Sequence, residues 1–131
     1  MYEKTGSMQV RVYTAGGALP LKGSLVRIYG ADEENKDVRF SLITDEDGIT
    51  KKIKLPAPPR ELSEDPNTSK APYALYNVDV IKDGYFEKKI YNLPVFEGIN
   101  SEQLVGMIPY SKSELNYPNG NLDSYTEDIS L

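Results

Sequence analysis

The stretch ITDEDGITKKIKLPAPP, Ile43 to Pro59, decides the fold of this chain. The turn-forming residues Asp45 to Gly48 lie between two segments in which apolar and polar residues alternate. Alternation with a period of two is typical of a half-buried β-strand. Asp and Gly at this spacing supply the side-chain-to-backbone bonds and the positive φ that a tight corner requires. The stretch therefore predicts two strands joined by an acidic hairpin turn.

The acidic turn also has the beginning of a calcium-binding loop. Asp45, Asp47 and Gly48 match its first positions, but an EF-hand needs a bidentate Glu at its twelfth position, and that position is Pro56 here. We therefore predict no metal site at this turn, and no cofactor elsewhere in the chain.

The same alternation recurs along the chain, and no long helical period accompanies it. Seven short strands are predicted: Met8–Tyr13, Ser24–Tyr29, Val38–Leu42, Lys51–Leu55, Tyr76–Val80, Phe86–Ile90 and Gln103–Ile108. Short strands separated by frequent turns are typical of a sandwich, so an all-β, seven-stranded antiparallel β-sandwich is expected. Nine residues are expected to point into its core: Val10, Val12, Val26, Ile28, Phe40, Leu42, Ile53, Val78 and Val80.

One domain over residues 8–109 is expected. Residues 1–7 are polar and are interpreted as an N-terminal arm or the remnant of a cloning junction, and residues 110–131 as a flexible polar tail. No apolar segment approaches the length of a membrane span, and no signal peptide is recognised. The compartment and the oligomeric state stay open.

Composition narrows the possible functions. The chain has 131 residues, a net charge of -5, no cysteine and no histidine. The missing residue types exclude thiolate nucleophiles, the Ser-His-Asp triad and most zinc sites, so we predict that the chain is not an enzyme. The weaker alternative is an enzyme that uses a pair of carboxylates, Asp79 and Glu97. The net negative charge argues against nucleic acid as a partner.

Tyrosines are the most distinctive residue type, with ten Tyr and no Trp. Arg11, Tyr13, Arg27 and Tyr29 are predicted on the solvent side of the first two strands. Exposed aromatic faces can stack on sugar rings, so these four residues form a candidate ligand-binding platform. Cross-strand packing of aromatic and cationic side chains is the alternative, and we favour it.

A long proline-rich segment, Pro56 to Pro72, is predicted as a loop rather than a strand. Five of its charged residues are candidates for docking a partner: Arg60, Glu61, Glu64, Asp65 and Lys70. The alternative is a plain connector between sheets, which is the commoner role of such loops.

Three motifs occur in an order that resembles a known family: LPLKGSLVRIYG, TDEDGIT and YNVDVIKDGYF, between Leu19 and Phe86. They resemble the carboxypeptidase-regulatory-like domains of the transthyretin-like (prealbumin-like) superfamily, over about residues 8–109. The resemblance implies a sandwich of prealbumin-like or immunoglobulin-like type.

A narrower similarity is to the non-catalytic N-terminal region of clostridial spore cortex-lytic enzyme precursors. It is carried by KLPAPP, APYALYNVDVIKDGY and LPVFEGINSEQLVGMIP. This resemblance implies an accessory or interaction module of a cell-envelope or spore peptidoglycan system. Its partner would be a protein or a cell-wall glycan, and a carbohydrate-binding module using exposed tyrosines is the alternative.

Overall fold

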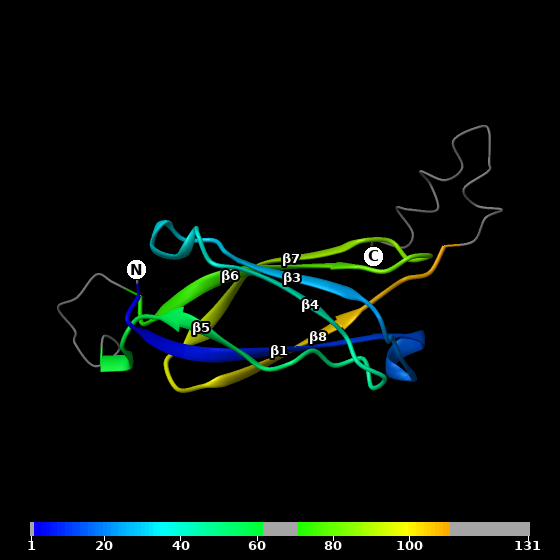
Figure 1. Cartoon of the computed structure of the whole chain (residues 1–131), viewed down its shortest axis with the longest axis horizontal. Helices are drawn as coiled ribbons and strands as arrows, with labels where there is room; N and C mark the ends of the chain where they lie inside the picture. Colours follow the sequence, from blue (N-terminus) through cyan, green and yellow to red (C-terminus); the bar gives the residue numbers. More distant parts are fainter. Residues whose placement is uncertain (1, 62–70, 111–131) are drawn as a thin grey trace.

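Two β-sheets pack face to face in this computed structural model, which describes residues 2–61 and 71–110 (Figure 1). The first sheet, here the β1 sheet, contains β1 (Lys4–Thr14), β2 (Leu19–Pro20), β5 (Ile53–Ala57) and β8 (Asn100–Gly106). The second, the β3 sheet, contains β3 (Leu25–Gly30), β4 (Arg39–Ile43), β6 (Tyr73–Ile81) and β7 (Lys88–Phe96). Two short 3₁₀ turns, η1 (Ala15–Gly17) and η2 (Glu33–Asn35), connect strands. The predicted all-β sandwich is confirmed.

The strand count and one pairing differ from the prediction. The described residues form eight strands rather than seven, because the two-residue strand β2 pairs with the end of β1, where Tyr13 lies opposite Pro20. The sandwich is also not wholly antiparallel. The last strand, β8, lies parallel to β1, with Ser7 opposite Asn100 and Tyr13 opposite Gly106. Side-chain alternation is the same in parallel and antiparallel strands, so it did not reveal this pairing.

The acidic turn is not a hairpin, and that part of the prediction was wrong. Strand β4 before it belongs to the β3 sheet, whereas β5 after it belongs to the β1 sheet, so the turn carries the chain from one layer to the other. Three hydrogen bonds fix it along β1: Val12 N donates to Gly48 O (2.7 Å), Thr50 N to Val10 O (2.9 Å) and Val10 N to Thr50 Oγ1 (3.0 Å). Buried backbone groups need such partners, and here they come from β1 rather than from a hairpin neighbour.

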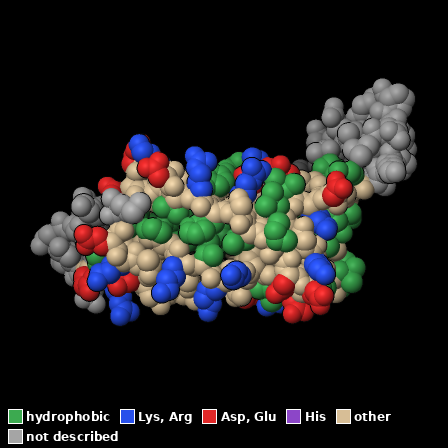
Figure 2. Space-filling model, viewed as in Figure 1, with side chains coloured by type: hydrophobic (Ala, Val, Ile, Leu, Met, Phe, Trp, Pro, Cys, Tyr) green, Lys and Arg blue, Asp and Glu red, His purple; other side chains and the backbone are tan. Residues whose placement is uncertain are grey.

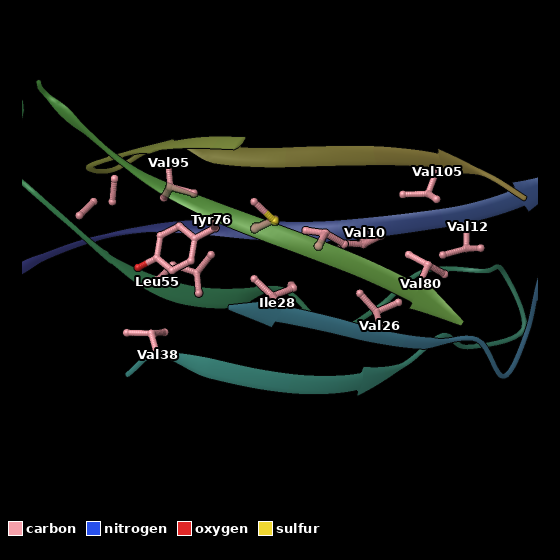
Figure 3. Packing of buried hydrophobic residues seen from close by; sticks show 14 of the residues in the cluster. Val10, Val12, Val26, Ile28, Val38, Leu55, Tyr76, Val80, Val95 and Val105 are labelled. Carbon is pink, nitrogen blue, oxygen red and sulfur yellow. The ribbon is translucent and has the colours of Figure 1, made fainter. Parts of the chain in front are cut away.

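The core lies between the sheets, and six of the nine predicted core residues are fully buried there: Val10, Val12, Val26, Ile28, Val78 and Val80. Figure 3 shows the side chains of five of them, Val10, Val12, Val26, Ile28 and Val80, between the strands. The other three, Phe40, Leu42 and Ile53, are half-buried and pack against this core from edge strands. In the view of Figures 1 and 2, hydrophobic side chains form a band across the side of the sandwich that carries β4 and β5.

Several buried residues were not in the predicted core. They come from segments predicted as loops or from strand positions that were not assigned to the core: Met8, Leu55, Ala57, Ala74, Tyr76, Val95, Val105 and Met107. Tyr76 is the largest of them, and its hydroxyl donates to the carbonyl of Pro56 on β5 (2.6 Å). A buried phenol needs such a polar partner.

Strands β1, β6 and β7 are longer than predicted, and β5 has the predicted length but begins and ends two residues later. Strand β1 begins at Lys4, inside the predicted N-terminal arm, and its residues 4–8 pair with β5. Gly6 allows β1 to lie close to β7 of the other sheet, because a Cβ at position 6 would collide with the carbonyl oxygen of Phe96. Pro56 was predicted to begin a loop, and Pro94 lay outside the predicted strands, yet they lie within β5 and β7. Both are edge strands, where a missing N–H costs little. The predicted tail lies outside the described residues except for Tyr110, whose N–H donates to Gly84 O.

Candidate functional site

A pocket of about 670 Å³ opens on the outer side of the β1 sheet, here called the outer pocket. It lies where β1 meets β2, β8 and the acidic turn. Its lining residues are Arg11, Val12, Tyr13, Gly16, Gly17, Pro20, Asp47, Ile49 and Leu104. The lining combines apolar side chains with the charged groups of Arg11 and Asp47.

Tyr13 lies beside a position that carries no side chain. Alternation along β1 turns Val12 into the core and Tyr13 outward, where its ring is half-buried. Its parallel partner is Gly106, and a Cβ there would lie 3.2 Å from ring atom Cε2 of Tyr13. The ring therefore rests against the β8 backbone, and a larger residue at position 106 would displace it.

Arg11 and Leu104 line the outer pocket from neighbouring strands. They are directly opposite each other in the β1–β8 pairing, and Leu104 is 51% exposed. The Nε of Arg11 lies 3.4 Å from a carboxylate oxygen of Glu102 on the same outer side. This contact uses one of five guanidinium N–H donors, so others remain to bind a ligand.

The acidic turn forms a wall of the outer pocket, and its two aspartates have different roles. The Oδ1 of Asp45 accepts hydrogen bonds from the N–H groups of Asp47 (2.9 Å) and Ile49 (3.0 Å). Gly48 has φ of 75°, and a Cβ there would collide with the carbonyl oxygen of Val12. Asp45 therefore shapes the turn, whereas Asp47 lines the pocket and no contact of its carboxylate is found within the described residues. Among all the described residues, no three acidic side chains lie close enough together to hold a metal ion.

The four residues of the predicted platform are not brought together. Arg11 and Tyr13 line the outer pocket on β1. Arg27 and Tyr29 lie on β3, in the other sheet, and point away from the core on the opposite outer side of the sandwich. The sequence pattern indicated correctly that all four point outward, but it did not indicate which sheet each strand joins.

The predicted docking loop is only partly described. Arg60 and Glu61 are exposed, and the backbone N–H of Arg60 donates to Oε1 of Glu97 (2.9 Å). Glu64, Asp65 and Lys70 lie outside the described residues. A docking role for this loop therefore stays a prediction.

The alternative carboxylate pair, Asp79 with Glu97, is not formed. Phe96 lies opposite Tyr73, and Asp79 is six residues further along β6. Six residues of strand span about 20 Å, too far for two carboxylates to share a reacting group.

The sequence interpretation missed several residues of the outer pocket. Leu104 was assigned to a strand without a facing partner, and Gly16, Gly17 and Pro20 were interpreted only as strand breakers. The pair of glycines leaves open space, because a Cβ at Gly16 or Gly17 would have no neighbour within 4 Å. A glycine pair next to an outward Arg-x-Tyr was the available signal.

Comparisons with known proteins identify the fold and no family. No protein-family model matches the chain, and no curated protein matches it. Among solved structures, the Bacillus anthracis TIE protein is similar over 82% of this chain and 17% of its own, at 19% identity and a TM-score of 0.53. Catechol 1,2-dioxygenase from Acinetobacter sp. ADP1 is similar over 82% of this chain and 53% of its own, at 14% identity and a TM-score of 0.56.

A third structure, 3-chlorocatechol 1,2-dioxygenase from Rhodococcus opacus 1CP, is similar over 84% of this chain and 61% of its own, at 14% identity and a TM-score of 0.56. This chain thus spans less than two thirds of each of these proteins. At such identities the likeness shows the fold alone.

These matches correct the prediction that the chain is not an enzyme. The two dioxygenases are enzymes and share this β-sandwich, so the fold is compatible with catalysis even though the chain lacks histidine and cysteine.

The described residues contain no helix with the length and apolar character needed to cross a bilayer.

Proposed function

We propose that this chain is an interaction module that binds carbohydrate of a cell envelope in the outer pocket. The observation that carries the proposal is the placement of Tyr13 against Gly106, with Arg11 and Asp47 also lining the pocket. The carbon-bound hydrogens of a sugar ring pack on an aromatic face, while its hydroxyls need hydrogen-bonding groups. An Arg donor, an Asp acceptor and an aromatic ring supply both kinds of contact.

The resemblance to carboxypeptidase-regulatory-like domains and to the N-terminal region of spore cortex-lytic enzyme precursors favours peptidoglycan as the source of that carbohydrate. The TIE protein adds a point about organisation, because the matching fold occupies 17% of its chain. A sandwich of this kind is thus one part of a longer protein there. An accessory module beside other domains is the corresponding role proposed for this chain.

A neutral oligomer of N-acetylglucosamine is the probe that tests the proposal, with affinity measured by isothermal titration calorimetry. We expect Tyr13→Ala to weaken binding by at least about tenfold, since truncating a central aromatic contact costs more than about 1.4 kcal/mol. Tyr13→Phe is the matched control, because it keeps the ring and should bind within about threefold of the unmodified chain.

Equal melting temperatures would establish that both variants fold. Absence of binding by the unmodified chain, or equal affinity of a folded Tyr13→Ala variant, would contradict the proposal. Loss of binding in Tyr13→Phe as well would mean that the hydroxyl rather than the ring face makes the contact.

A further inference from the structure

The outer side of the β3 sheet carries a carboxylate that is buried although its strand position faces solvent. Asp79 alternates with the core residues Val78 and Val80, yet it is only 7% exposed. The hydroxyl of Tyr29, on the neighbouring strand, donates to its Oδ1 (3.2 Å). A buried carboxylate is retained only when it is hydrogen-bonded or paired, so this contact fixes the Tyr29 ring on the sheet surface.

The Tyr29 hydroxyl stays protonated and can serve as that donor. Burial raises the pKa of Tyr29 above its ordinary value, and the nearby charge of Asp79 raises it further. The ring is therefore a neutral and oriented group at the centre of this face.

Two arginines flank the fixed ring. Arg39 is directly opposite Tyr29 in the β3–β4 pairing, and Arg27 lies two residues before Tyr29 on β3. Diagonal neighbours of this kind lie about 7–8 Å apart, within reach of one ligand for side chains as long as arginine. Both are exposed, and no ion pair or hydrogen bond of either side chain is found among the described residues.

A third cation of this face, Lys89, already has an acidic partner. Lys89 lies opposite Asp79 on β7, and its Nζ lies 3.3 Å from a carboxylate oxygen of Glu87. Tyr91, two residues further along β7, is 59% exposed. The face thus offers two tyrosines and two arginines without an ion pair among the described residues, one of which, Arg27, lies opposite Asp79 in the β3–β6 pairing, in a chain whose net charge is -5.

We propose that the outer side of the β3 sheet, centred on Tyr29 between Arg27 and Arg39, binds a carboxylate-bearing glycan. The forked guanidinium groups match planar carboxylates. The tyrosines offer ring faces to the sugars between those carboxylates. An acidic peptide would also pair with the arginines, and it is the competing outcome of the test. This surface is separate from the outer pocket, which lies on the opposite side of the sandwich.

The test is a titration with an oligomer of galacturonic acid at low and high salt. We expect binding that weakens with salt, and a loss of about tenfold in affinity for Arg27→Gln and for Arg39→Gln. Tyr91→Ala should weaken binding as well. The control is Lys54→Gln, which removes an exposed cation from β5 of the other sheet, outside the lining of the outer pocket, and should leave this affinity unchanged. Melting temperatures show whether each variant is folded.

Five results would overturn the inference. Three concern the ligand: absence of uronate binding, equal binding of a neutral galactose oligomer, and equal binding of an oligoglutamate peptide. Two concern the variants: unchanged affinity in folded Arg27→Gln and Arg39→Gln variants, and an equal loss of affinity in Lys54→Gln. Because the outer pocket is tested with a neutral sugar and with Tyr13, failure of either proposal leaves the other standing.

Discussion

At the scale of single residues, Asp45 stabilises the turn that carries the chain between the sheets. Its carboxylate accepts two backbone hydrogen bonds, whereas the carboxylate of Asp47 accepts none within the described residues. We therefore expect Asp45→Ala to lower the free energy of unfolding by about 1 kcal/mol, the usual effect of losing such side-chain-to-backbone bonds. Urea denaturation measures this difference.

Asp47→Ala is the control and should change the stability by less than about 0.5 kcal/mol. Equal effects of the two substitutions would contradict the assigned roles. A calcium-dependent rise in melting temperature that Asp47→Ala abolishes would indicate a metal site instead, because a ligand that binds only the native state must raise it.

The sequence predicted single-residue features well where they depend only on residues nearby in the chain. Asp45 and Gly48 had the composition of a corner, and a corner is formed. The outward direction of Arg11 and Tyr13 followed from the alternation along β1. What could not be predicted is contact between distant residues, such as the Tyr13 ring lying against Gly106.

At the scale of elements, Tyr76 connects β6 to β5 through its bond to the Pro56 carbonyl. Burial raises the pKa of Tyr76 from 10.0 to about 12. The folded state therefore keeps the phenol proton more tightly than the unfolded chain does. Its contribution to stability is complete below pH 10 and is lost as the pH rises from about 10 to about 12.

Tyr76→Phe should then behave differently from the unmodified chain in two ways. At neutral pH it should be less stable by about 1 kcal/mol, because one buried hydrogen bond is lost and the Pro56 carbonyl loses its donor. Between pH 10 and pH 12 its stability should fall less steeply. Urea denaturation across this range measures both effects, and an unchanged slope would contradict the role of Tyr76.

The pairing of elements was the least predictable feature. Alternation identified the strands and their inward sides, but it is identical for a hairpin and for a crossing between sheets. Strands β4 and β5 were thus interpreted as neighbours although they lie in different sheets. The parallel contact of β1 with β8 joins residues as far apart as Ser7 and Asn100, and no local signal encodes it.

At the scale of the whole molecule, the two sheets present different outer sides. The β1 sheet has a concave pocket with an aromatic wall, and the β3 sheet has a fixed tyrosine between two arginines. Strand alternation turns both sets outward, and the two-layer arrangement places them on opposite sides. The two proposals together imply a module that holds two chemically distinct ligands at once.

The most direct test of the central proposal is the amide NMR spectrum of the chain during titration with a neutral N-acetylglucosamine oligomer. Binding in the outer pocket predicts concentration-dependent shifts at Arg11, Tyr13, Ile49 and Leu104, with the amides of Arg27 and Tyr29 unchanged. A spectrum without shifts at saturating sugar, or with shifts confined to the β3 sheet, would contradict it.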